Sequence, residues 1–193
     1  MAIQVQLRRG TAAQNNAFTG AIGELSFDTT ANQVRIHDGS TAGGFKIGVG
    51  NFPTGTNNVV LGNTALDDLD SSSPGGNNTA VGHDALTANT TASFGVAVGS
   101  GALAANTTGV NNVAVGGGAL TASTTATDNT AVGHQALNAN TSGHSNTALG
   151  TEAGHDLTTG VRNVIVGAKA GDAATTTDDT TLVGYGAGGG AIM

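Results

Sequence analysis

Two consecutive stretches of the chain have the same length and nearly the same sequence: NVAVGGGALTASTTATD at residues 112–128 and NTAVGHQALNANTSGHS at residues 129–145. The glycine at the fifth position of each stretch recurs eight times, always after Val or Leu. The first interval between these glycines is 20 and the next six are all 17. The repeat glycines are Gly62, Gly82, Gly99, Gly116, Gly133, Gly150, Gly167 and Gly184. A period this regular indicates a repeat protein.

Other positions keep the same period. The residue three before each repeat glycine is always Val or Thr, the residue three after it is always Ala, and the residue four before it is Asn in six copies. The residue four after the glycine is Leu in the first five copies and Gly in the last three. A column of threonines stands eight positions after the glycine, at Thr90, Thr107, Thr124, Thr141, Thr158 and Thr175.

A unit of this length is too short for the two packed helices of a helical repeat, but it suits one coil of a β-solenoid. Stacked coils would pair each strand with its copies in the next coils at about 4.8 Å per coil, so eight coils give a parallel β-solenoid or β-roll about 40 Å long. The invariant glycine indicates a backbone conformation or a close approach that a Cβ would obstruct. Asn and Thr-Thr-Gly are typical of turns.

The residues around the glycine alternate as in a strand, so the residues three and one before it face one side and the small Ala between them faces the other. We assign the Val or Leu before the glycine and the Leu four after it to a thin core, and the Ala to the outer face. A core this thin favours lateral association through the Ala column, most simply as a homotrimer.

The composition fits this repeat and excludes several protein classes. Gly, Ala, Thr and Asn make up 110 of 193 residues, which leaves too few large apolar side chains for an ordinary globular core. The periodicity argues against the alternative, a disordered chain. Residues 51–193 carry two basic and ten acidic residues, so we expect no nucleic-acid binding. The chain has no Cys, no apolar run long enough to span a bilayer and no secretory signal pattern, so we expect synthesis in a host cytoplasm and no membrane insertion.

Residues 1–50 do not share the repeat, and we predict two domains, 1–50 and 51–193. Residues 3–7 alternate as a strand, and residues 24–28 and 33–37 are expected to form a hairpin. The glycine-rich stretch 48–55, which includes Pro53, is expected to be a hinge. The predicted fold class is therefore all-β throughout, with a small N-terminal β module ahead of the solenoid.

Several blocks within residues 1–48 occur in the order of a known family: QLRRGT at 6–11, FTG at 18–20, ELSFDT at 24–29, VRIHDG at 34–39 and TAGG at 41–44. They resemble the N-terminal domain of phage tail-fibre proteins of the major tropism determinant type. That resemblance implies a β module that forms trimers and anchors a fibre to the virion. The N-T-A-V-G-x-x-A-L repeats are similar to those of phage fibres and, more distantly, to the left-handed β-roll head of trimeric autotransporter adhesins.

His83 and His134 are candidate ligands because they occupy the same position, one after the repeat glycine, three coils apart. Around a three-fold axis, three copies of one His could hold a metal or an anion. The other residues at that position vary and are mostly polar, which favours a solvated surface over a metal site, and we assign no metal and no cofactor. The acidic groups at 67–70 and 178–179 are interpreted as solvated loop carboxylates.

We assign no catalytic residues and expect no enzyme, because no nucleophile motif accompanies the Ser, His and Asp residues. The Thr column could bind ice, but adjacent threonines point to opposite sides of a strand, which favours a turn or inter-coil role.

The sequence therefore predicts a structural virion protein of a tailed phage. It would be a homotrimeric tail fibre or spike that docks on other virion proteins through residues 1–50 and projects the solenoid, with contact to a host surface glycan or protein as a further expectation. The alternatives are a head fibre or capsid decoration protein, and a receptor-binding adhesin with contacts on exposed turns or near Tyr185.

Overall fold

A computed structural model of the chain describes residues 8–10, 14, 17, 25–28, 33–36, 40, 45–47, 57–62, 64–66 and 75–189. The chain forms two compact units, Met1–Phe52 and Pro53–Met193. We describe each unit by itself. Within the described residues, no helix has the length and apolar character that crossing a membrane requires.

The first unit contains a four-stranded sheet in the order β1-β2-β3-β4. Its strands are β1 (Arg8–Gly10), β2 (Leu25–Asp28), β3 (Gln33–Ile36) and β4 (Phe45–Ile47). The expected hairpin is confirmed, because β2 and β3 pair antiparallel with Leu25 opposite Ile36. β1 pairs parallel with β2, and β4 pairs antiparallel with β3. The predicted strand at residues 3–7 and the predicted hinge at 48–55 lie outside the described residues.

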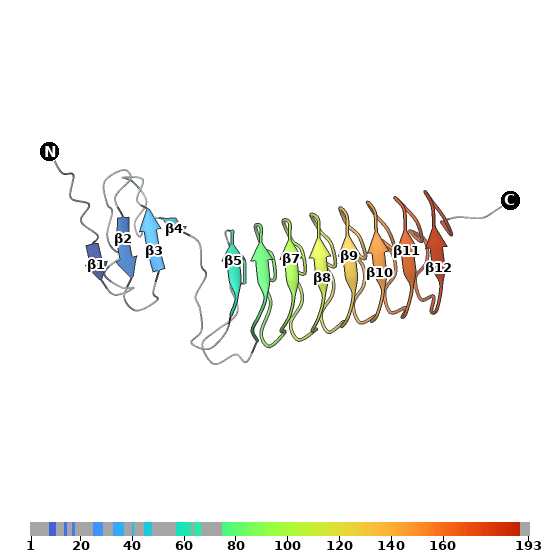
Figure 1. Cartoon of the computed structure of the whole chain (residues 1–193), viewed down its shortest axis with the longest axis horizontal. Coiled ribbons are helices and arrows are strands. Elements are labelled where there is room, and N and C mark those ends of the chain that lie inside the picture. The colour runs from blue at the N-terminus through green and yellow to red at the C-terminus, as the bar shows by residue number, and fades with distance from the viewer. Residues whose placement is uncertain are drawn as a thin grey trace. The chain divides into compact units, whose positions relative to one another are not determined.

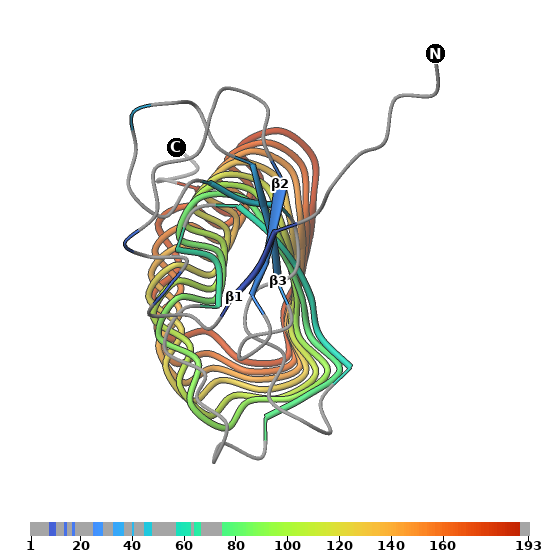
Figure 2. The ribbon, with the colours of Figure 1, turned by 90° about the vertical axis from the view of Figure 1, so that its left-hand side faces the viewer.

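The second unit is the predicted parallel β-solenoid, and the all-β fold class is confirmed. Eight three-residue strands form one sheet with their order in space following their order in the chain (Figure 1). They are β5 (Val59–Leu61), β6 (Thr79–Val81), β7 (Val96–Val98), β8 (Val113–Val115), β9 (Thr130–Val132), β10 (Thr147–Leu149), β11 (Val164–Val166) and β12 (Thr181–Val183). Each strand pairs in parallel with the next at equivalent positions, for example Val113 with Thr130. Seven turns therefore separate the first strand from the last, and the coils overlie one another in the end view (Figure 2).

Each of the first seven repeat glycines lies directly against the backbone of the next coil. The φ angles of all eight repeat glycines range from +128° to +144°, a region that side chains disfavour. A Cβ on Gly82 would lie 2.6 Å from the carbonyl oxygen of Gly99 in the next coil. The strict recurrence of glycine at this position therefore has both a conformational and a steric cause.

The core differs from the sequence expectation because the opposite face of each strand points inward. The middle residue of the strand faces inward and is buried, as at Ala97, Ala114 and Ala131, while its neighbours on both sides are partly or largely exposed. The expectation that Val or Leu before the glycine enters the core and that Ala faces outward was wrong. The buried cluster also contains the Ala three after the glycine and the Leu four after it, so the narrow coil has room opposite this Leu column only for a small side chain.

The leucines of this core adopt a left-handed backbone conformation. Leu86, Leu103, Leu120 and Leu137 have φ between +50° and +53° and are fully buried. The equivalent positions in the last three coils are Gly154, Gly171 and Gly188, also with positive φ. In those coils the larger inward side chains are Leu157, Ile165 and Leu182, and a Cβ on Gly154 would meet Ile165 at 3.0 Å. In the last three coils, the core is therefore filled by large side chains from other positions of the coil.

Candidate functional site

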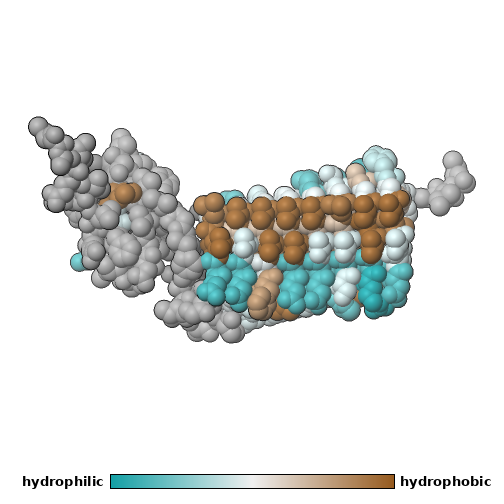
Figure 3. Space-filling model, in the orientation of Figure 1, coloured by the Kyte–Doolittle hydropathy of each residue, from teal (hydrophilic) through white to brown (hydrophobic). Residues whose placement is uncertain are grey.

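The outer face of the solenoid sheet is an apolar strip built from the first and third residues of strands β5–β12. The third residue, directly before the repeat glycine, is Val or Leu in every strand, and the first is Val or Thr. Leu61 is 58% exposed and Val183 is 69% exposed. Two parallel rows of these side chains run the length of the sheet, and one of them is apolar throughout (Figure 3). We call this surface the outer strip.

The Thr column is part of the scaffold. The hydroxyl Oγ1 of Thr90 donates to the carbonyl oxygen of Thr107 at 3.0 Å, and the same bond links Thr107 to Thr124 at 3.1 Å. Further bonds of this kind continue along the column to the Thr158–Thr175 bond, at 2.8 Å. The hydroxyls thus bridge successive coils, which supports the inter-coil role that the sequence favoured over ice binding.

The Asn residues four before the repeat glycine are buried, and their side chains bond to backbone groups further along their own coil and in the next coil. The side-chain Oδ1 of Asn129 accepts from the backbone N–H of Asn146 at 2.9 Å, and its Nδ2 donates to the carbonyl oxygen of Gly143 at 2.8 Å. Asn146 bonds to Asn163 and Gly160 in the same way. A side chain that satisfies buried backbone groups in this way avoids the cost of leaving them unpaired.

A second column of buried Asn stands seven after the repeat glycine, directly before the Thr column. Asn89 closes a local ring with Ala92, accepting from its N–H at 2.9 Å and donating to its carbonyl oxygen at 3.3 Å. Asn106 makes the same pair of bonds with Gly109. The sequence signal of this column is its shared spacing from the glycine, at Asn89, Asn106 and Asn140, and the local bonds agree with the assignment of Asn to turns.

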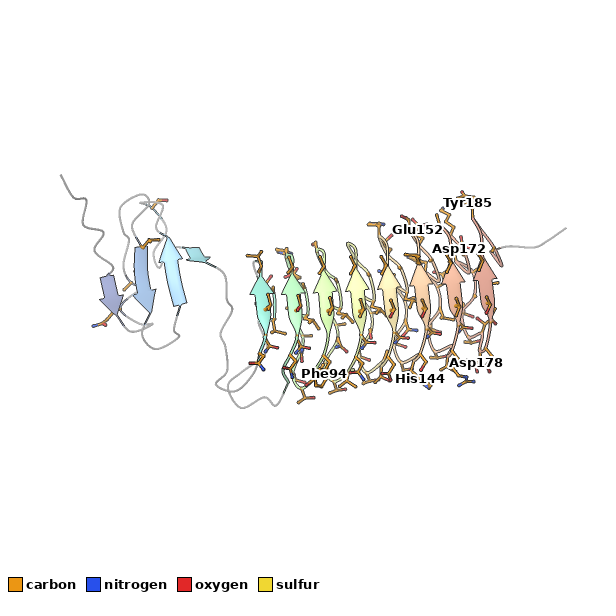
Figure 4. The ribbon with its side chains drawn as sticks, in the orientation of Figure 1. Phe94, His144, Glu152, Asp172, Asp178 and Tyr185 are labelled. Carbon is orange, nitrogen blue, oxygen red and sulfur yellow. The ribbon has the colours of Figure 1, made fainter. Side chains whose placement is uncertain are left out.

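The two long edges of the solenoid present its other exposed side chains. Phe94, His144 and Asp178 project from one edge, and Glu152, Asp172 and Tyr185 lie toward the opposite one (Figure 4). Phe94 is 59% exposed and Tyr185 is 82% exposed. Both edges are mainly polar, and we treat the two aromatic residues as candidate contact points.

The charged groups of the edges pair across coils. Arg162 donates from Nε and Nη2 to the two carboxylate oxygens of Asp179, at 2.6 and 2.8 Å. This hydrogen bond lowers the pKa of Asp179 and raises the pKa of Arg162. Lys169 lies 3.4 Å from Glu152, one coil away. Asp178 accepts from the backbone N–H of Val161, whereas residues 67–70 lie outside the described part of the chain.

The candidate metal ligands lie on the surface. His83 Nδ1 is 2.8 Å from Asp84 Oδ2, and the His83 side chain is 59% exposed. His134 is exposed three coils away, so the two histidines do not meet within one chain. In the described ranges, no group of three His, Cys, Asp or Glu residues is close enough to hold a metal ion. The alternative that the sequence analysis did not favour, a metal site shared between copies of the chain, stays untested.

Comparisons with known proteins bear on the first unit. The profile of the Major tropism determinant N-terminal domain matches residues 5–41. A curated relative, the tail fiber receptor-binding protein of Bordetella phage BPP-1, is 53% identical over 47 residues. That match covers 24% of this chain and 12% of the relative. No solved structure matches the chain. Residues 5–41 of this chain are therefore similar to the N-terminal domain of the major tropism determinant.

Proposed function

We propose that the protein is a structural component of a phage virion, a homotrimeric tail fibre or spike that attaches through its N-terminal domain and projects the β-solenoid. The observation that carries this proposal is the match of residues 5–41 to a domain found in a tail fiber receptor-binding protein. The domain boundary that we propose lies close to residue 50, near the division of the chain into its two compact units.

The solenoid is suited to the role of a spacer. Its coils are joined by backbone bonds, the Thr bridges and the buried Asn column, so stability is distributed over the interfaces between neighbouring coils. Each added coil lengthens such a structure by about 4.8 Å without requiring a larger core. A rod of this kind can set the distance between an attachment domain and whatever lies beyond it.

Association of copies is supported by the outer strip. Exposed apolar surface that continues along a whole sheet marks an interaction site more often than an ordinary solvated face. The three-fold order of the association comes from the family resemblance and from the thin core of each coil. The route through the Ala column is excluded, because those residues are buried inside the coil.

The test is to locate the full chain in phage particles. A C-terminal tag detected with gold in electron micrographs should appear on the outer surface of the phage tail. Insertion of six further repeat units should move the gold outward by about 29 Å, six strand spacings of about 4.8 Å. Gold on the capsid would favour a head fibre instead, and the absence of the tag from washed particles would contradict a virion role.

A second candidate function, contact with a host surface, is favoured by the two exposed aromatic residues. Aromatic side chains are enriched at protein contacts, and the chain exposes Phe94 and Tyr185 on polar edges. The full chain should then bind host cells saturably, and replacing both aromatic residues by Ala should reduce that binding. If the double variant binds as the original chain does, these residues make no contact with the host. We assign no catalytic role.

A further inference from the structure

The last strand of the solenoid, β12, leaves one edge of the sheet open. It pairs with β11 on one side and with no strand of the described residues on the other (Figure 1). In β11 the backbone N–H of Val164 donates to the carbonyl oxygen of Thr180 in the last coil, at 2.8 Å. The equivalent N–H one coil later, that of Thr181, has no partner within the described chain. The carbonyl oxygen of Val183 is likewise unpaired there, although that of Val166 accepts a bond from the last coil.

The apolar interior of the solenoid is open at the same end. The inward strand residue and the Ala three after the repeat glycine are fully buried in the middle coils, as at Ala114 and Ala119. In the last coil the residues at these positions, Leu182 and Ala187, are partly exposed. A Cβ added to Gly184 would meet nothing closer than 4.0 Å, whereas the seven earlier repeat glycines lie against backbone. The last coil therefore has the surface of an internal coil without the neighbour that an internal coil has.

The last coil lacks two features that usually protect such an edge. Exposed sheet edges commonly carry charged residues or proline, and the terminal repeats of solenoids have a polar outer surface. Residues 180–189 contain neither a charged residue nor a proline. Val183 and Tyr185 are the most exposed large apolar side chains of the described chain. An edge of this kind is suited to pairing with another strand.

The solenoid itself shows what binds to an edge of this kind. Each of the seven earlier strands is covered on this side by a coil of the same repeat, parallel and in register. We propose that the C-terminal end of the solenoid binds a coil of another protein, which continues the sheet as a further parallel strand and covers Leu182 and Ala187. The partner strand is uncharged, with one apolar residue facing inward between small or β-branched neighbours. Main-chain hydrogen bonds supply the affinity and the inward residue supplies the specificity, as in other cases of strand addition.

A second copy of the chain is a poorer partner for this end. Its first coil would have to supply the covering strand, but the core residues of that coil, Val60, Ala65 and Leu66, are already buried, with 6–7% exposure. End-to-end stacking of copies would also not close and would give an open polymer. The partner is therefore a different polypeptide. This inference goes beyond the proposed function, because it concerns the end of the solenoid and holds wherever in a virion the chain is found.

The interaction can be tested with the full chain and a peptide probe. The probe is a fluorescently labelled peptide with the sequence of residues 163–179, the repeat unit directly before the last coil. Its fluorescence anisotropy should rise saturably as the full chain is added, and a scrambled peptide should not bind. Thr181→Pro should weaken binding at least ten-fold, because proline removes the free N–H and its ring blocks the approach of the partner carbonyl. Failure of the peptide to bind, or equal binding by the proline variant, would overturn the proposal.

Thr181→Val is the matched control for the proline variant. It keeps the backbone N–H and introduces the residue that β11 has at this position, so it should bind the peptide as the original chain does. Proline is tolerated on an edge strand where its N–H would face solvent. Continued protection of the Gly184 amide from hydrogen exchange would show that the last coil of the proline variant still pairs with β11. Equal loss of binding in both variants would assign the effect to the side chain and contradict the proposal.

Hydrogen exchange of the unchanged chain gives a second readout that does not depend on how the variants fold. The Thr181 amide should exchange at least ten-fold more slowly when the peptide is saturating. An unchanged rate would place the peptide elsewhere, for example on the outer strip, and would overturn the proposal. Sedimentation of the chain alone should give a particle of fixed size, whereas particles that keep growing with concentration would show that copies of the chain occupy the end. None of these readouts involves a virion, so their failure is distinct from failure of the tail-fibre proposal.

Discussion

Gly99 lies directly against Gly116 of the next coil, so that a Cβ added to Gly99 would be 2.6 Å from the carbonyl oxygen of Gly116. Real Cβ atoms do not approach backbone that closely, and the φ of +130° at Gly99 is strained for any side chain. The same relationship is repeated between the repeat glycines of the other stacked coils. It explains why glycine is kept at this position while the residue that follows it varies.

Gly99→Ala should lower the free energy of unfolding by about 3 kcal/mol or more, because backbone strain and a clash with backbone act together. The control is Gly101→Ala in the same coil, where φ is +69° and a Cβ would meet nothing within 4 Å. This control should cost only about 1–2 kcal/mol, the left-handed penalty. Denaturant titration measures both, and equal costs would show that close approach is not the cause.

Asn129→Ala should cost about 2–5 kcal/mol, because it leaves the backbone N–H of Asn146 and the carbonyl oxygen of Gly143 buried and unpaired. Asn138→Ala removes a single, partly buried bond to the carbonyl oxygen of Gly118 and should cost about 1 kcal/mol. Thermal unfolding followed by circular dichroism compares the two variants. If Asn138→Ala proved as costly, the buried column would have no special role.

Much of the fold was predictable because the period of a repeat constrains backbone register directly. The strands, their parallel stacking and the conformational need for glycine all follow from positions that recur once in every repeat unit. The inward direction of the strand was not predictable from alternation, since period 2 separates two faces without saying which is buried. Ala114 is buried and Val115 is partly exposed because the coil is narrow, and a single sequence does not show the width.

In the candidate site, too, some features could be predicted from the sequence and others could not. The Thr bridges follow from a regular column of hydroxyls, but the burial of Asn129 depends on three-dimensional closure of the coil. The outer strip was missed because its Val residues had been assigned to the core. Ile165 replaces the inward Ala of earlier coils, and this exchange becomes meaningful only once Gly154 and Gly171 are seen to lie beside it.

Deleting residues 112–128 should leave a folded and shorter solenoid, because Asn129 would then follow Asn111 at the same point of the coil. Deleting only residues 112–119 should unfold the chain around the break, since the remaining half unit cannot stack in register. Circular dichroism and sedimentation distinguish a shorter rod from a disrupted one. Equal tolerance of the two deletions would contradict the stacking observed here.

The Asp179–Arg162 pair should give a small pH dependence. Because the pKa of Asp179 is lowered in the folded chain, the stabilisation is present above the ordinary Asp pKa, about 3.9, and is lost as the pH falls through the lowered value. Asp179→Asn should therefore lower the melting temperature slightly at pH 7 and low salt, and the difference should vanish in acid or at high salt. Asp178→Asn is the control, and a difference that persists in acid would rule out ionisation as its cause.

The core arrangement of the last coils can be introduced into an earlier coil by mutation. Ala114→Ile alone should overpack the coil and cost about 1–3 kcal/mol, and Leu120→Gly alone should open a cavity and cost about 2–5 kcal/mol. Together they reproduce the pair found at Ile165 and Gly171, in which a large strand residue fills the space over a glycine.

The glycine also relieves the left-handed strain of Leu120, whose φ is +51°. The free energy of unfolding that the double variant loses should therefore be smaller than the sum of the two single losses by about 0.5–3 kcal/mol. A double-mutant cycle measures this difference. Additive costs would mean that the two positions fill separate spaces and that the resemblance between the coils is coincidental.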